Sequence, residues 1–141
     1  MNSELATKFT ALEADISAER GDFALFALFL REDTSDRWDL IVSAPWASAD
    51  QKGSLDYLID KIKADLGAQD LNQLSRIVFV DPKDNAVASM NRAVQVEHGS
   101  VEIRDSNFFG LPIKHAFIIT SKRLNNLSQN GPAGGGVERR A

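Results

Sequence analysis

The chain has 141 residues, of which 43% are hydrophobic and 26% are charged, with a formal net charge of −4 and no cysteine. This composition excludes a disordered chain, and the absence of thiols excludes disulfides, cysteine nucleophiles and cysteine-held zinc or iron–sulfur groups. The length predicts one domain over residues 1–127, and the glycine-rich composition of residues 128–141 predicts a flexible tail.

Apolar runs in the chain are short. The longest covers residues 23–30 and has eight residues, whereas a membrane-spanning helix needs about 20. The first residues carry an early acid and lack the apolar run of a signal peptide. We therefore expect a cytoplasmic protein without a membrane partner.

Residues 3–19 are predicted to form an amphipathic helix that ends at Gly21. The helix is indicated by apolar side chains at steps of four, three and four residues, which place them on one face. These side chains are Leu5, Phe9, Leu12 and Ile16. Such a face implies that the helix packs on another layer.

A β-hairpin is predicted next. Residues 23–30 are apolar at every position, as in a strand covered on both faces. Residues 31–37 are polar and turn-forming, and residues 38–44 are again rich in apolar and β-branched side chains. Two strands joined by a polar loop favour an antiparallel pair.

A second helix is predicted from about Ser54 to Gly67, preceded by a loop or one extra turn capped by Ser48 or Asp50. Residues 77–80 follow as a short, wholly apolar run, which is typical of a buried central strand. The intervening helix would allow this strand to lie parallel to a neighbour.

The remaining elements are a short helix capped by Asp84 or Asn85, an edge strand over residues 101–104 and a last strand over residues 113–120. Gly110 and Pro112 indicate a bend before the last strand, with the rings of residues 108–109 packed beneath it. The order α-β-β-α-β-α-β-β predicts an α+β fold, with a mixed sheet of about five strands flanked by helices.

Motifs for catalysis or cofactor binding are absent from the sequence. It contains neither a phosphate-binding glycine loop nor a Gly-x-Ser-x-Gly elbow, and His98 and His115 are the only histidines. We therefore predict no cofactor and assign no catalytic or metal-binding residue.

Asp39, on the second predicted strand after an initial helix, is similar in position to the metal-binding aspartate of restriction-endonuclease-like nucleases. That family also uses a Glu-x-Lys motif, which this sequence lacks. We expect Asp39 to point outward from the sheet and to pair with Arg37.

Charge is unevenly distributed along the chain. Residues 1–70 carry a balance of −7 and residues 71–141 a balance of +3. An acidic half and two tryptophans near charged residues favour a non-enzymatic protein-interaction module of a regulatory, inhibitory or immunity type. The predicted partner is a protein, and self-association is left open as one form of this binding. The candidate binding residues are Trp38, Trp46, Asp36, Arg37 and Asp39.

Two alternatives stay open. One is a metal-assisted hydrolase or nuclease, which would use Asp39 together with a histidine. The other is an accessory protein that binds nucleic acid through its basic half. Because the basic residues are scattered, nucleic acid is the less favoured partner, and it would require five cations to lie on one face. These are Arg92, Arg104, Lys114, Lys122 and Arg123.

Overall fold

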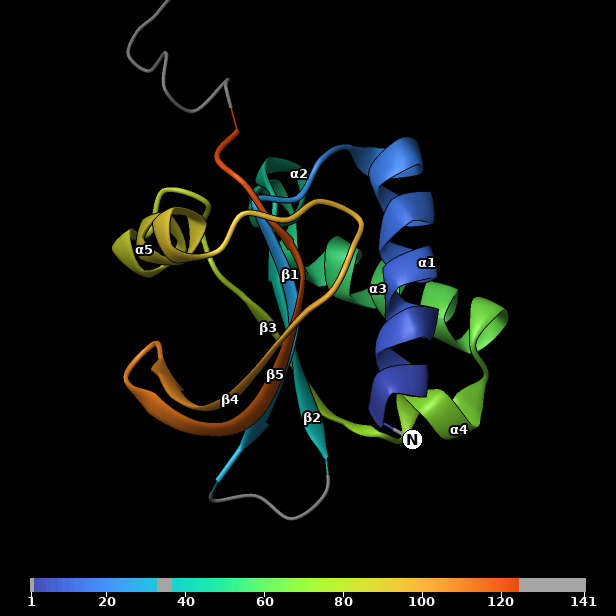
Figure 1. Ribbon diagram of the computed structural model, residues 1–141. Coiled ribbons are helices and arrows are strands. Elements are labelled where there is room, and N and C mark those ends of the chain that lie inside the picture. Colours follow the sequence, from blue (N-terminus) through green and yellow to red (C-terminus); the bar gives the residue numbers. More distant parts are fainter. Residues whose placement is uncertain (1, 33–36, 125–141) are drawn as a thin grey trace, which may run out of the picture.

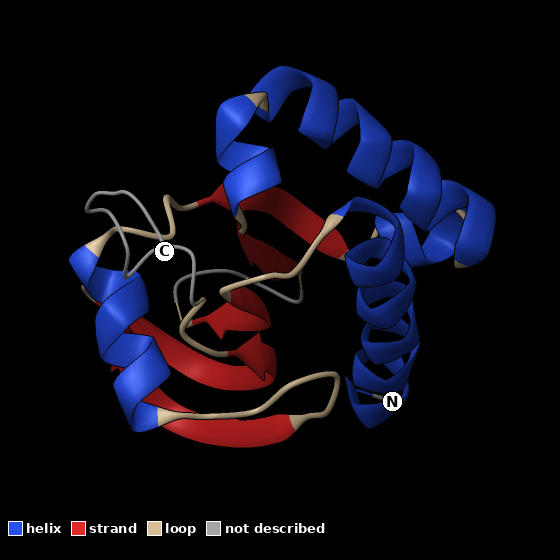
Figure 2. Ribbon diagram, turned by 90° about the horizontal axis from the view of Figure 1, so that it is seen from above, coloured by secondary structure: helices blue, strands red, loops and turns tan. Residues whose placement is uncertain are grey.

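Residues 2–32 and 37–124 are described by the computed structural model, and they form a mixed sheet of five strands with helices on both faces (Figures 1 and 2). This arrangement confirms the predicted α+β fold and the order of its elements. The elements are α1 (Asn2–Arg20), β1 (Leu25–Arg31), β2 (Trp38–Ser43), α2 (Pro45–Ala49), α3 (Gln51–Asp65), α4 (Ala68–Leu71), β3 (Leu74–Phe79), α5 (Asn85–Ala93), β4 (Val101–Phe108) and β5 (Leu111–Ser121).

The strands lie in the order β3-β2-β1-β5-β4. β1 and β2 form the predicted antiparallel hairpin, with Leu28 opposite Leu40. α3 returns the chain to the edge of the sheet at which β2 begins. β3 therefore starts beside the start of β2 and pairs with it in parallel. β5 pairs antiparallel with β1 on one side and with β4 on the other.

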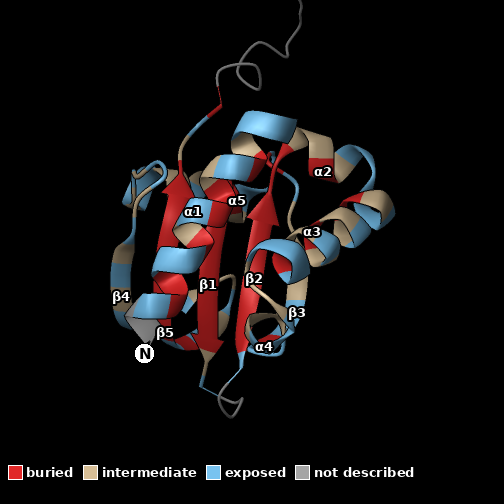
Figure 3. Cartoon of the chain, turned by 90° about the vertical axis from the view of Figure 1, so that its right-hand side faces the viewer, coloured by how far each residue is buried: buried red, intermediate tan, exposed pale blue. Residues whose placement is uncertain are grey.

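β1 lies at the centre of the sheet and is covered on both faces, as its apolar run predicts. Phe26 and Leu28 pack toward α1 and α3, whereas Ala27 and Phe29 pack toward α5. Figure 3 shows buried residues along β1, β2 and β5, and more exposure on the two outer strands. The core therefore consists of two apolar layers that share β1.

Helix ends follow local sequence signals. Gly21 has a φ of +125° and stops α1, with its N–H donated to the carbonyl of Ser17. Asp50 accepts a hydrogen bond from the N–H of Gly53, so α3 begins three residues before the predicted start at Ser54. Asp84 caps α5, as expected, by accepting from the N–H of Ala86.

β3 corrects one prediction. The sequence predicts residues 77–80 in a central, buried strand, but β3 is an edge strand and these residues are only partly buried. Ile77 contacts the α1–α3 layer and Val78 the α5 layer. A strand that is apolar at every position is therefore one whose two faces are both at least partly covered. Such a strand need not have a neighbouring strand on each side.

The bend expected at Gly110 and Pro112 is a tight hairpin turn between β4 and β5. Phe109 and Gly110 have φ values of +56° and +75°, which characterise the turns that join two antiparallel strands directly. The rings of Phe108 and Phe109, which were predicted to pack beneath this bend, lie 5.2 and 5.8 Å from the ring of Phe29 on β1. The predicted tail, residues 128–141, lies outside the described residues.

Candidate functional site

Trp38 is a core residue. It is 2% exposed, and its ring lies 5.5 Å from that of His115 and 5.6 Å from that of Phe117. Trp38 belongs to the apolar layer between the sheet and helices α1 and α3, where its ring fills part of the core. A binding partner would have to displace the core to reach it.

Trp46 is the more accessible of the two tryptophans. It lies in the first turn of α2, where its ring meets those of Phe23 and Tyr57 edge-on at 5.5 and 6.2 Å. The indole N–H donates to the carbonyl of Gly21 at 3.1 Å. Trp46 therefore connects the end of α1 to α2 and α3, and the structure does not bring it together with Trp38.

A charged network surrounds this junction. The guanidinium of Arg20 lies 5.3 Å from the Trp46 ring and 4.4 Å from the Tyr57 ring, in cation–π geometry. Burial, together with a hydrogen bond donated to the Glu19 carboxylate, raises the pKa of Tyr57 to about 12. The Arg20 cation therefore has the two aromatic rings as its partners, and the Tyr57 hydroxyl has the Glu19 carboxylate.

Among the predicted binding residues, Asp39 has the environment that differs most from the prediction. Instead of facing solvent beside Arg37, it is 2% exposed and lies on the α5 side of the sheet. Its Oδ2 atom is 2.8 Å from Nε of Arg31 and 3.2 Å from Nε of Arg76. The antiparallel pairing of β1 and β2 and the parallel pairing of β2 and β3 bring both cations to it. Arg37 is exposed, and Asp36 lies outside the described residues.

A groove lies over this ion pair, with a volume of about 670 Å³. Its floor combines apolar side chains from four strands and the β4–β5 turn with the Asp39 carboxylate, and Asp81 and Asp84 stand at one end. Oδ1 of Asp39 has no hydrogen-bond partner among the described residues. We call this site the β3 groove; its main residues are Phe29, Asp39, Ile41, Arg76, Val78 and Phe109.

The two histidines pair with glutamates. Nδ1 of His98 is 2.6 Å from Oε1 of Glu13, and Nε2 of His115 is 2.6 Å from Oε2 of Glu102. The hydrogen bond with His115 is the main cause that lowers the pKa of Glu102, and the bond from Arg104 is the second. Burial raises this pKa, but its effect is smaller. Within residues 2–32 and 37–124, no three acidic or histidine side chains are grouped to hold a metal ion.

The five cations of the predicted nucleic-acid surface have different environments. Arg104 pairs with Glu102 at 2.8 Å, and Lys122 pairs with Asp22 and Glu97. Lys114 is exposed on β5. Arg92 and Arg123 lie together in a second pocket beside α5.

Glu13 and Arg76 carry important contacts that sequence reasoning missed. Glu13 had a detectable signal, because it stands four residues after Phe9 on the apolar face of α1. Arg76 had none, because its partner lies on a different strand.

Comparison with protein-family models, curated proteins and solved structures finds no significant match to this chain. No helix in the described ranges has the combination of length and apolar character needed to cross a bilayer.

Proposed function

We propose that this protein is a non-enzymatic protein-interaction module, and that β3 together with the β3 groove binds an extended segment of a partner protein. The proposal rests mainly on one observation. β3 is an edge strand with an apolar run that is only partly buried and lies beside a groove. Open strand edges with side-chain pockets next to them bind peptides by strand addition.

The backbone of β3 has groups free for such pairing. The N–H of Val80 donates to the carbonyl of Val42, toward β2. Because main-chain groups of successive strand residues point to opposite sides, those of Phe79 and Ile77 are directed away from β2. No further strand pairs beyond β3 within the described part of the chain. An added strand would satisfy these donors and acceptors.

Side chains in the groove would supply selectivity. Val78 is partly buried and lines the groove together with Phe29 and Phe109, so the groove suits apolar side chains at alternate positions of a bound segment. Asp81 and Asp84 at its end favour a segment with a lysine or arginine there. The balance of −7 over residues 1–70 would add long-range attraction for a basic partner.

Site-specific photocrosslinking in the cell of origin tests this proposal. A photoreactive residue in place of Ser75, exposed on β3, should give a discrete adduct with a second, different polypeptide. The same residue in place of Asn107, exposed on the opposite edge strand β4, should give none. The Val78→Lys substitution should abolish the Ser75 adduct, whereas Val101→Lys, at a half-exposed valine of β4, should not.

Three results would contradict the proposal. They are no adduct from position 75, equal adducts from both edges, or an adduct unchanged by Val78→Lys. An adduct of twice the mass of this chain would assign the edge to a second copy and would overturn the assignment to a different partner.

A further inference from the structure

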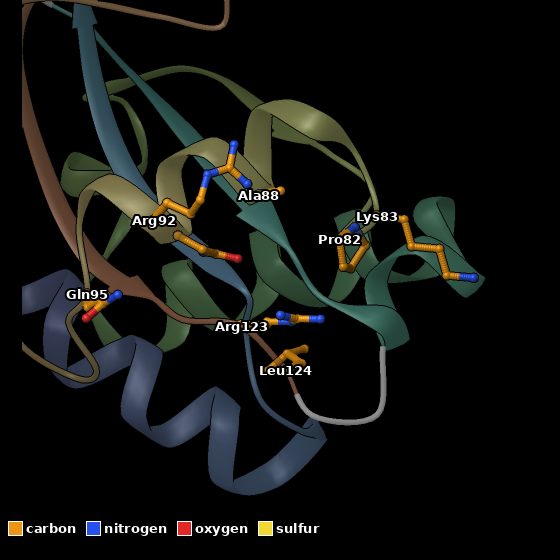
Figure 4. A pocket seen from close by; sticks show the side chains of 8 residues that line it. Pro82, Lys83, Ala88, Arg92, Gln95, Arg123 and Leu124 are labelled. Carbon is orange, nitrogen blue, oxygen red and sulfur yellow. The ribbon is translucent and has the colours of Figure 1, made fainter. Parts of the chain in front are cut away.

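A second pocket, which the proposed function does not use, lies beside α5. Its volume is about 530 Å³, within the range of small-molecule sites. The loop after β3, one face of α5 and the segment that follows β5 form its walls (Figure 4). We call it the α5 pocket; its main residues are Pro82, Lys83, Ala88, Arg92, Arg123 and Leu124.

The pocket has a defined wall. Ala88, Asn91 and Arg92 recur at helical spacing on one face of α5, and Gln95, two residues past its end, continues the wall. The side-chain amide of Asn91 donates to the carbonyl of Ala24 and to the hydroxyl of Ser121, both at 3.0 Å. These bonds attach α5 to the residue before β1 and to the end of β5, next to the segment that contributes Arg123.

The charge of the pocket has one sign. Arg92, Arg123 and Lys83 are all cationic, and no carboxylate is among the lining residues. Arg92 bonds the Ser89 hydroxyl, and no described acid pairs with Arg123 or Lys83. Lys122, next in the chain to Arg123, is by contrast bound to two carboxylates. The pocket therefore carries positive charge that is not neutralised within the described residues.

The three cations come from different elements. Figure 4 shows Arg92 on α5 with its guanidinium beside Ala88, Lys83 next to Pro82 on the loop after β3, and Arg123 between Gln95 and Pro82. Lys83 lies at the outer rim. Two guanidinium groups from separate elements suit the oxygens of a phosphoryl group, which they bind through charge-assisted pairs of hydrogen bonds.

We propose that the α5 pocket binds a small phosphorylated molecule. Arg92 and Arg123 donate hydrogen bonds to its phosphoryl oxygens, and Lys83 adds charge at the rim. The side chains of Pro82, Ala88 and Leu124 contact its uncharged part. A small molecule is favoured over a nucleic acid because two of the other cations of the basic half, Arg104 and Lys122, already pair with carboxylates.

Calorimetric titration of the full chain tests this inference, with pyrophosphate as the phosphoryl probe and adenosine diphosphate as a probe that also has an uncharged part. Both should bind saturably, and Arg92→Gln or Arg123→Gln should weaken binding about tenfold or more. Arg104→Gln removes the same charge from an exposed position on β4 and should leave both affinities unchanged. Chemical shift changes on adding pyrophosphate should centre on Ala88, Arg92 and Leu124.

Absence of saturable binding by both probes would overturn the inference. An equal loss of affinity in Arg104→Gln would also overturn it, because it would show attraction by net charge alone. Tighter binding of a single-stranded oligonucleotide than of adenosine diphosphate, with loss in Arg104→Gln, would assign the surface to nucleic acid. None of these outcomes depends on partner binding at β3, so the two proposals fail separately.

Discussion

Nδ1 of His98 lies 2.6 Å from Oε1 of Glu13, a residue 85 positions earlier in the chain. The other oxygen of Glu13 accepts a hydrogen bond from the Thr120 hydroxyl at 2.7 Å, and that hydroxyl in turn accepts from the backbone N–H of His98 at 3.0 Å. Glu13 is fully buried, so this closed network connects the centre of α1 to β5 and to the loop before β4.

Removing Glu13 should destabilise the fold markedly. Glu13→Ala leaves the buried hydroxyl of Thr120 without its acceptor and opens a small cavity, so we expect a loss of about 2–4 kcal/mol in the free energy of unfolding. Urea denaturation measures it. Glu4→Ala, at an exposed position of the same helix, should cost less than about 0.5 kcal/mol. Similar losses in the two variants would contradict a structural role for the network.

Asp39 and its two arginines should contribute unequally to stability. Asp39→Ala removes a buried carboxylate that accepts from both Arg31 and Arg76, so it should cost about 1.5–3 kcal/mol in the free energy of unfolding. Arg76→Ala should cost less than about 1 kcal/mol, because Arg76 is half-exposed and Arg31 still neutralises Asp39. Denaturation with urea compares the two variants. A larger loss for Arg76→Ala would show that Arg31 is not the main partner of Asp39.

Tyr57 should make stability fall at high pH. Its pKa is raised from 10.0 in the unfolded chain to about 12 in the folded protein. The folded state therefore binds this proton more tightly, and the contribution is fully present below pH 10 and is lost as pH rises through 12. Because Tyr57 is the only tyrosine, tyrosinate absorbance reports its titration directly.

A matched variant separates the two causes of this shift. Glu19→Gln removes the neighbouring charge but leaves the burial, so it should lower the pKa of Tyr57 without returning it fully to 10.0. Ionisation of Tyr57 at its ordinary pKa in the folded wild-type protein would contradict the environment described above.

The two tryptophans should differ in access to solvent. In Trp46→Phe the remaining fluorophore is Trp38, which is buried, so acrylamide should quench its emission less than in Trp38→Phe. Trp46→Phe also loses the hydrogen bond to the Gly21 carbonyl, and we expect a loss of about 0.5–1.5 kcal/mol in the free energy of unfolding. Equal quenching of the two variants would contradict the burial of Trp38.

Local features of this protein follow directly from the sequence. The apolar spacing of α1, the stop at Gly21 and the cap at Asp84 depend on a few neighbouring residues, and all are confirmed. The wholly apolar run of β1 also indicated coverage on both faces, because an exposed face would have had alternating polar residues.

The features that the sequence did not predict depend on how strands far apart in the chain pair with one another. The apolar residues of β3 resemble those of β1, and only the strand order makes one an edge and the other the centre. Likewise, the choice of Arg31 and Arg76 over Arg37 as partners of Asp39 depends on strand register. Periodicity and caps report the environment of a single element. Edges, grooves and buried ion pairs arise where separate elements meet, and the free energy that selects them is shared among residues far apart in the chain.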